Sequence, residues 1–293
     1  MLQTLSECFQ TYGLDLWAPI ALEHCSIKKS YLLERAGIRA GTAIILAVPY
    51  YTKACESGDR NLSAYAVSRD YHGFFRRFFG EILPFLRNKF PQERFEGFAD
   101  HSPIAEVEAA ARAGLGVIGE NHLLITEKYS SYIFLGELIT SASLPSELHP
   151  IGHCHACGRC KQHCPMEDCG GCLSALTQKK GELTPEEETS LLRYGSVWGC
   201  DICQEVCPYT LAARKSGSIF SPVSYFQEQS IPHLTVELLD SMSDEEFENR
   251  AFAWRGRQTI RRNLLLAERD GNRSPNCDAD SSGQNGAEKG NIC

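Results

Sequence analysis

Apolar runs alternate with helical patterns along the first 150 residues of the chain. Residues 1 to about 40 place apolar side chains at helical spacing and end near Gly37 and Gly41, residues typical of helix ends. The segment 43–51 is short, apolar and closed by a proline, so it predicts a buried strand. This alternation is typical of a domain in which helices cover a sheet.

Aromatic residues dominate the next helical pattern. Residues 65–89 place phenylalanines at spacings of one, three and four, which predicts a long amphipathic helix broken around Pro84. Another helix is expected from Pro103 to Ala113, because proline suits a first helical turn. Two strands, 122–126 and 132–141, are expected to follow, joined by a turn. We therefore predict an α/β domain over residues 1–150.

The second half of the chain has only short helical patterns. Helices are expected within 173–193, one of them beginning at Thr184-Pro185, and two more within 234–268. The last residues are rich in Gly, Ser, Asn and Asp without apolar periodicity, which predicts disorder. The fold class is therefore expected to be α+β, with four segments: residues 1–150, a cysteine-rich domain 151–215, a helical segment 216–269 and a disordered tail 270–293.

Nine of the fourteen cysteines lie in the 54 residues from Cys154 to Cys207. The first four have the C-x2-C-x2-C-x3-C-P spacing in which three thiolates hold one [4Fe–4S] cluster and the fourth serves a second cluster. The remaining ones are Cys172 and a C-x2-C-x3-C-P run from Cys200. If the two halves are pseudo-symmetric, the ligand sets are Cys154, Cys157, Cys160 and Cys207 for one cluster, and Cys164, Cys172, Cys200 and Cys203 for the other. Cys169 is then a spare that could replace Cys172.

Structural zinc and disulfides are the alternatives for these cysteines. Zinc sites typically use two CxxC pairs for one ion, whereas each half here contains a ligand for its neighbour and ends in Cys-Pro. Disulfides need an oxidising compartment, yet the N-terminus lacks the basic and apolar regions of a signal peptide. No run of 18 apolar residues occurs. We therefore expect two [4Fe–4S] clusters in a soluble, cytoplasmic protein with no membrane partner.

Composition limits the other functions of the chain. The formal net charge of −8 disfavours phosphate binding, so an RNA partner would need a local basic patch. Clusters that could supply one are Arg69 with Arg76 and Arg77, and Arg255, Arg257, Arg261 and Arg262; both could equally be solvated helix faces. The sequence Gly114-Leu-Gly116-x2-Gly119 matches a dinucleotide-binding pattern but follows a predicted helix instead of a strand.

Several motifs, in this order, together resemble the epoxyqueuosine reductase family over residues 1 to about 265. They are Arg69-Asp70-Tyr71-His72, Asp100-His-Ser-Pro103, Ala113-Gly-Leu-Gly116-x2-Gly119, Phe134-Leu-Gly-Glu137-Leu, and the split cysteine array with Tyr194-Gly-x3-Gly199-Cys200-Asp201. The family is cobalamin-dependent and related to reductive dehalogenases. The resemblance implies an N-terminal α/β cobalamin-binding domain, followed by a ferredoxin-like domain with two [4Fe–4S] clusters and short C-terminal helices.

The resemblance also implies an activity, which is the reduction of epoxyqueuosine to queuosine at the tRNA wobble position. Asp100 matches the proton donor, and we expect its pKa to be raised in an apolar cofactor pocket. The alternative is that Asp100 caps the helix after Pro103. An external donor such as flavodoxin or ferredoxin would supply the electrons. Cofactor contacts are expected from Tyr71, His72, Asp100, Leu124, Leu135, Ser174, Cys200 and Asp201.

Two departures from the family pattern concern tRNA more than redox chemistry. Glu120 stands where family members usually carry a basic residue. The chain also resembles a short form of the family, without the C-terminal helical-repeat module of longer members. Two alternative functions are therefore a cobalamin and iron–sulfur reductase of a small molecule or corrinoid partner, and a non-catalytic ferredoxin-type electron carrier. A carrier would not need the 150-residue α/β domain.

Overall fold

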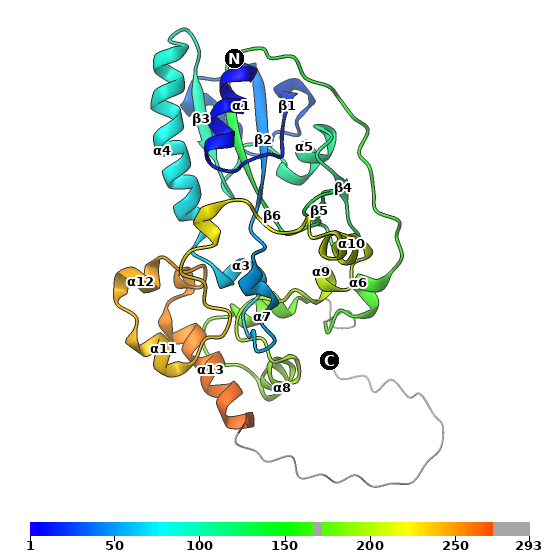
Figure 1. Ribbon diagram of the computed structural model, residues 1–293, viewed down its shortest axis with the longest axis vertical. Coiled ribbons are helices and arrows are strands. Elements are labelled where there is room, and N and C mark those ends of the chain that lie inside the picture. Colours follow the sequence, from blue (N-terminus) through cyan, green and yellow to red (C-terminus); the bar gives the residue numbers. More distant parts are fainter. Residues whose placement is uncertain (167–170, 272–293) are drawn as a thin grey trace.

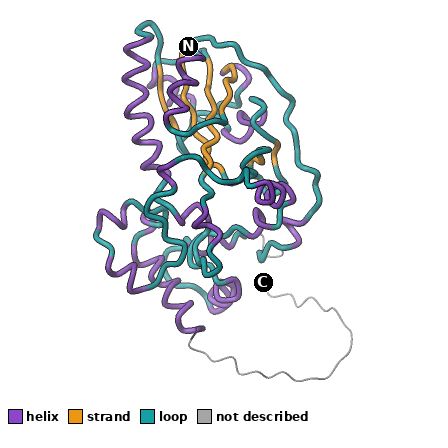
Figure 2. The backbone as a smooth tube through the Cα atoms, in the orientation of Figure 1, coloured by secondary structure: helices purple, strands orange, loops and turns teal. Residues whose placement is uncertain are grey.

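The computed structural model describes residues 1–166 and 171–271, and Figure 1 shows the arrangement of their helices and strands. A sheet with its covering helices forms one end of the molecule, and short helices form the other. Figure 2 shows that the strands are confined to the first of these two ends. Residue Cys169 and residues 272–293, which make up most of the predicted tail, lie outside the described residues.

A four-stranded antiparallel sheet carries the N-terminal half, in the order β1-β2-β6-β3. Its strands are β1 (Trp17–Ala21), β2 (Thr42–Pro49), β3 (Phe95–Phe98) and β6 (Ile133–Thr140). All eight residues of β2 are buried, as expected for the apolar run at 43–51. A separate two-stranded ribbon pairs β4 (Val117–Ile118) with β5 (Leu124–Ile125).

Helices cover both faces of this sheet. Alternate residues of β2, such as Ile44 and Ile45, pack into different apolar cores because successive strand side chains point to opposite faces. One core contains α1 (Leu2–Thr11) and α4 (Tyr71–Lys89), and the other contains α2 (Ser30–Ala36) and α5 (Glu106–Arg112). The predicted mixture of helices and strands is thus confirmed, with a sheet whose strand pairs are all antiparallel.

The structure corrects two details of the predicted N-terminal half. Strand β1 lies inside the segment expected to be helical, and its Pro19 is tolerated because β1 is at the sheet edge. Helix α4 also continues through Pro84. A proline inside a helix costs about 3 kcal/mol, whereas each buried apolar side chain contributes roughly 1.5–3 kcal/mol. Six buried side chains of α4 therefore outweigh the break: Phe74, Phe75, Phe78, Ile82, Leu83 and Leu86.

The strands expected at 122–126 and 132–141 exist as β5 and β6, but they do not pair with each other. β6 instead lies at the centre of the sheet between β2 and β3. A long irregular connection then runs from the sheet to the cysteine-rich end of the molecule (Figure 1). This connection lets residues far apart in sequence share one compact structure.

Short helices build the cysteine-rich and C-terminal regions. The predicted helix start at Thr184 is confirmed, since its side chain forms a capping box, and Ser243 forms a second capping box within the region expected to be helical. The apolar core beneath α4 continues into the C-terminal helices through Trp198 and Phe252. Among the described residues, no helix is long and apolar enough to cross a membrane. The helices are α3 (Ala64–Val67), α6 (Arg159–Gln162), α7 (Leu173–Thr177), α8 (Pro185–Tyr194), α9 (Ile202–Glu205), α10 (Pro208–Ser216), α11 (Val236–Ser241), α12 (Asp244–Glu248) and α13 (Arg257–Gly271).

Candidate active site and cysteine pocket

Asp100 lies in the loop between β3 and α5, and its backbone has φ of +60°. This left-handed conformation is uncommon for residues with a side chain, although aspartate tolerates it better than most. The loop brings Asp100 to the N-terminus of α4, where Tyr71 and His72 are the first two helical residues. The structure therefore unites the three residues that the sequence assigned to acid chemistry and the cofactor pocket.

Asp100 accepts hydrogen bonds from both neighbours. Nε2 of His72 lies 2.8 Å from Oδ2 of Asp100, and the Tyr71 hydroxyl donates to the same oxygen. On its other side, Nδ1 of His72 lies 3.0 Å from Oδ1 of Asp70, the N-cap of α4. We call Asp70, Tyr71, His72 and Asp100 the Asp100 cluster. Asp70 was quoted in the sequence motif without a role, and its position before the helix was the only signal for one.

The electrostatics of the cluster differ from the expected raised pKa of Asp100. Partial burial does raise the pKa of Asp100, but hydrogen bonds from His72 and Tyr71 outweigh burial and lower the net pKa. Hydrogen bonds to Asp100 and Asp70 raise the pKa of His72 to about 10. At neutral pH the proton of this pair therefore resides on His72, and Asp100 is a carboxylate.

The helix-capping alternative for Asp100 is wrong. Helix α5 begins at Glu106 with Ala105 as its N-cap, and no side chain caps it. Asp100 lies several residues earlier and uses its carboxylate within the cluster instead. About half of its side chain is exposed, so the carboxylate remains accessible from outside.

An open apolar strand end lies next to the cluster. The ring of Phe134 stacks on Tyr71 with centroids 4.2 Å apart. The first three residues of β6 are only partly buried, whereas the following five are buried. Leu135 belongs to this half-exposed end, but Leu124 is buried in the core against α5. Of the two expected apolar contacts, only Leu135 thus has a side chain open to the outside.

Ser174 is connected to the Asp100 cluster by way of Gln178 and Tyr65. Its hydroxyl accepts a 3.1 Å hydrogen bond from Gln178, whose amide also reaches the hydroxyl of Tyr65. Tyr65 interacts electrostatically with Asp70, Cys172 and Asp201. The second cysteine set and the Asp100 cluster are therefore neighbours in the fold.

Asp201 is committed to a buried ion pair. Its Oδ2 atom lies 2.6 Å from the Arg60 guanidinium, and it also accepts hydrogen bonds from Ser63 and from the backbone N–H of Ala64. Only 3% of the Asp201 side chain is exposed. The expectation that it contacts a cofactor stays a prediction, and its contacts join the segment next to Cys200 to residues 60–64.

A close backbone approach places Cys200 against the N-terminal region. Gly199 has φ of +75°, and a Cβ at this residue would lie 2.4 Å from Cβ of Ser63. Only glycine fits this conformation and this distance. The backbone N–H of Ser63 also donates to the carbonyl of Trp198 at 2.8 Å.

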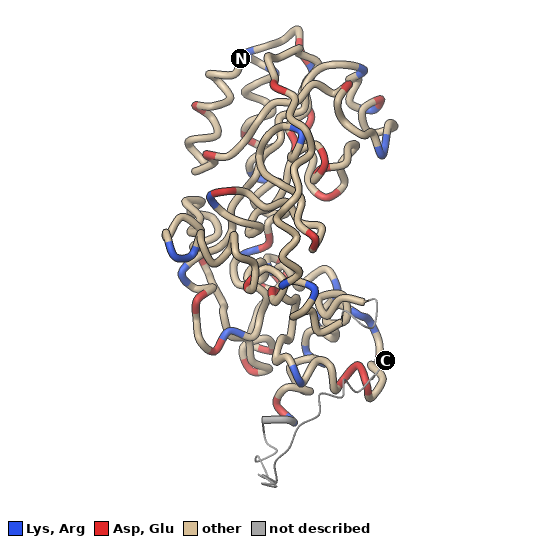
Figure 3. Tube along the Cα trace, turned by 90° about the vertical axis from the view of Figure 1, so that its right-hand side faces the viewer, with Lys and Arg blue, Asp and Glu red and all other residues tan. Residues whose placement is uncertain are grey.

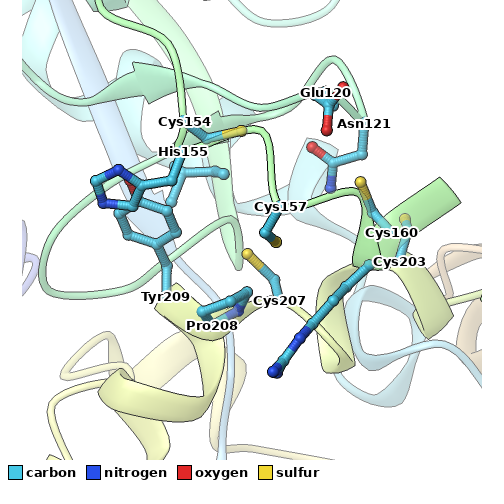
Figure 4. Close-up of a pocket in the computed structure, with 12 residues that line it drawn as sticks. Glu120, Asn121, Cys154, His155, Cys157, Cys160, Cys203, Cys207, Pro208 and Tyr209 are labelled. Carbon is cyan, nitrogen blue, oxygen red and sulfur yellow. The ribbon is translucent and has the colours of Figure 1, made fainter. Parts of the chain in front are cut away.

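All four cysteines of the first predicted set line one pocket. Figure 4 shows the side chains of Cys154, Cys157, Cys160 and Cys207 around this space, with Cys203 beside them. The His155 ring stacks on Tyr209 at 5.4 Å between centroids and forms one wall. Segments almost fifty residues apart in sequence thus meet at one pocket, while the division of the cysteines into two ligand sets stays a prediction.

Three of the four cysteines in the second predicted ligand set lie close to one another. Cys172, Cys200 and Cys203 interact electrostatically, and Cys203 also interacts with Cys160. Burial raises the pKa of Cys200 to about 12 and that of Cys203 to about 11. A thiolate at these positions therefore needs a nearby positive charge. Cys164 is half-buried, and all described cysteines are free of disulfides.

No group of three or more His, Cys, Asp or Glu residues is arranged to hold a metal ion within residues 1–166 and 171–271. Glu120, the residue that departs from the family pattern, also lines the cysteine pocket. Its carboxylate lies 2.8 Å from Nζ of Lys161 on α6, and this hydrogen bond lowers the pKa of Glu120. The negative charge is thus balanced within the protein.

The two basic clusters of the sequence are largely neutralised. Each of four arginines lies near a carboxylate: Arg69 near Glu228, Arg77 near Glu81, Arg257 near Asp244 and Arg261 near Asp240. Figure 3 shows Lys and Arg interspersed with Asp and Glu over the side that it displays. This mixture is typical of solvated helix faces.

Comparison with known proteins gives a consistent family. No family model matches the chain. The chain is 33% identical over 251 residues to an epoxyqueuosine reductase of Lactococcus garvieae, covering 78% of this chain and 68% of that protein. An epoxyqueuosine reductase structure from Streptococcus thermophilus matches with a TM-score of 0.73 and 23% identity, covering 91% of this chain and 80% of that one.

A second solved structure is an epoxyqueuosine reductase with an epoxyqueuosine-modified tRNA-Tyr stem loop. It matches with a TM-score of 0.69 and 25% identity, covering 91% of this chain and 81% of that chain. Sequence identity and fold therefore agree over most of the length. The chain belongs to the epoxyqueuosine reductase family, whose members are oxidoreductases.

Proposed function

We propose that this protein reduces epoxyqueuosine to queuosine at the wobble position of tRNA. The observation that carries the proposal is the Asp100 cluster, in which Asp100 receives hydrogen bonds from His72 and Tyr71 beside a half-exposed apolar strand end. Removal of an epoxide oxygen as water consumes two electrons and two protons. The Asp100 cluster supplies one of these protons from the protonated His72 imidazole, solvent supplies the second, and the cysteine array supplies the electron path.

The cysteine pocket would hold an iron–sulfur cluster. Cys154, Cys157, Cys160 and Cys207 surround one space, as expected when each thiolate binds a different iron atom. We assign these four residues to the first [4Fe–4S] cluster. The mutual interactions of Cys172, Cys200 and Cys203 support the second assignment, completed by Cys164. Under this proposal, residues 151–215 form the electron-transfer domain.

The region of residues 1–150 would hold cobalamin. The first three residues of the central strand β6 are only partly buried, and an apolar edge there suits a large planar cofactor. Leu135, Tyr71 and His72 would contact it from this domain, and Ser174 and Cys200 from the cysteine region. When bound, cobalamin supplies low-valent cobalt chemistry that accepts single electrons from a cluster.

Proton delivery is the part that the protein's own residues perform. Protonated His72 donates to Asp100, and a proton passes from this pair to the departing oxygen. Asp70 holds the opposite ring nitrogen of His72 and thereby fixes the ring orientation. The transferred proton therefore begins on His72 and reaches the oxygen through Asp100.

The direct test is anaerobic turnover of an anticodon stem-loop that contains epoxyqueuosine. The protein is reconstituted with iron, sulfide and cobalamin, and a strong chemical reductant replaces the external flavodoxin or ferredoxin. Nucleoside mass spectrometry should then detect queuosine. If no queuosine forms while spectroscopy shows that clusters and cobalt are reduced, the proposed activity is wrong. An unmodified stem-loop serves as the substrate control.

A further inference from the structure

Glu137 is a fully buried carboxyl that the proposed chemistry does not use. It lies in the central strand β6, is 0% exposed, and neither carboxyl oxygen has a well-formed hydrogen bond from an N–H or O–H group. A buried unpaired carboxylate is very costly, so such a group requires either a partner or a proton. The cross-strand partners of Glu137, Ile45 and Phe98, are apolar and offer neither.

The nearest polar group is a second carboxyl. Glu106, the first residue of α5, faces Glu137, and its buried Oε1 also lacks a donor. Two carboxylates cannot form a hydrogen bond with each other, because neither carries a donor. One added proton turns the same contact into a charge-assisted O–H···O⁻ hydrogen bond.

This pair lies directly beneath the loop that carries Asp100. The backbone N–H of Asp100 lowers the pKa of Glu106, and the hydroxyl of Ser102 lowers the pKa of Glu137. Asp100 and Ser102 therefore lie close enough to the two carboxyls to influence their charge. Asp100 is also the loop residue whose backbone has the left-handed conformation.

We propose that Glu106 and Glu137 share one proton and act as positioning residues for the Asp100 loop. Neutral Glu137 donates to Glu106, and anionic Glu106 accepts from the backbone N–H of Asp100. The left-handed loop is thereby held with the Asp100 carboxylate against His72. The inference deepens the proposed function and, for its kinetic readout, rests on it.

The charged surroundings agree with one shared proton. Burial is the main cause that raises the pKa of both carboxyls, and the charge of Glu106 adds to this for Glu137. Other titratable groups that act on the pair include Asp100 in the loop, Lys29 before α2, and the Cys25 thiol. Lys29 is the cation among these three and lowers the pKa of Glu106, so we assign the negative charge to Glu106.

An infrared measurement tests the proton without any assay of activity. The full-length protein at pH 7 should show the C=O stretch of a protonated carboxyl, shifted in D2O and lost in Glu137→Gln. The control Glu147→Gln removes a carboxyl that is 83% exposed and should leave this band unchanged. Absence of the band in the unsubstituted protein overturns the proposal, whether or not a variant folds.

Kinetics test the positioning role. Glu137→Gln keeps a permanent donor toward Glu106 and should retain turnover within about twofold. Glu106→Gln removes the anionic acceptor, so kcat should fall about 10- to 100-fold while KM stays unchanged, as expected for a misplaced catalytic group. Faster hydrogen exchange of the Asp100 amide should accompany this loss. An unchanged kcat in folded Glu106→Gln overturns the proposal. An inactive unsubstituted protein that shows the carboxyl band would instead refute the proposed function.

Discussion

The Nε2 atom of His72 lies 2.8 Å from Oδ2 of Asp100, which makes the two side chains one acid–base unit. The pair combines a carboxylate whose pKa is lowered with an imidazole whose pKa is raised to about 10. Each of the two charged side chains stabilises the charge on the other, and this causes the two pKa shifts. Under the proposed function, both residues together are therefore the acid, and Asp100 is the one that passes the proton to the substrate.

Replacement of Asp100 by asparagine should abolish turnover and leave both cofactors bound. Asparagine keeps the size of the side chain but cannot accept and pass on the proton from His72. Because general acid catalysis typically contributes about 10²- to 10⁴-fold, kcat should fall at least 100-fold. Single-turnover assays with cofactor quantification check this result. Asp59→Asn, at an exposed aspartate, is the control; an active Asp100→Asn variant would refute the assignment.

The His72 interaction should stabilise the protein in a defined pH window. Its folded pKa is raised from 6.5 to about 10, so its contribution is complete below pH 6.5 and is lost as pH rises through about 10. His72→Gln should therefore lower the Tm at pH 6 and have little effect above pH 10. Because 46% of the His72 side chain is exposed, solvent screening will keep the effect modest. A difference in Tm that grows with pH would contradict the pairing.

Individual cysteines should remove one cluster at a time. Cys157→Ser should lose the cluster in the pocket of Figure 4, and Cys200→Ser should lose the other. Each variant should retain about half of the bound iron and sulfide, since each [4Fe–4S] cluster has its own thiolate set. Iron and sulfide analysis with electron paramagnetic resonance distinguishes the two losses. Cys8→Ser, at a free cysteine of α1, should keep both clusters.

The cysteine pattern was the part of the site most accessible from sequence. Its spacing alone grouped Cys154, Cys157 and Cys160 with Cys207, and the structure brings these four residues to one pocket. Spacing works here because ligand geometry is local and repeated in both halves. The pKa of Asp100 was not accessible in this way, because it depends on two donors from α4 that fold beside it.

In the sheet, too, features set by the local sequence could be predicted, and features set by distant residues could not. The buried run of β2 was recognised because every residue is apolar, whereas β1 was hidden by Pro19 and by the helical spacing before it. Glu137 was visible only as one letter in a motif. Its buried position against Glu106 follows from the packing of α5 on β6, which no local pattern encodes.

Loss of the Asp201 carboxylate should destabilise the fold. In Asp201→Asn the Arg60 guanidinium, which is only 14% exposed, would lose its main buried counter-charge. Breaking such a pair typically costs about 3–5 kcal/mol. Chemical denaturation should detect this decrease in the free energy of unfolding. Asp240→Asn removes an exposed pair with Arg261 and should change stability by about 1 kcal/mol or less. Equal effects of the two variants would argue against the structural role of Asp201.

Glutamine at position 137 should stabilise the protein increasingly as pH rises. The pKa of buried Glu137 is raised well above 4.5, mainly by burial and by Glu106, so folding above that pH requires uptake of a proton. The unsubstituted protein should lose about 1.4 kcal/mol of stability per pH unit from this one proton until the folded pKa is reached. Glu137→Gln avoids this loss. Urea denaturation at pH 6, 7 and 8 measures the difference in the free energy of unfolding. A constant difference over this range would show that Glu137 is already ionised in the folded protein.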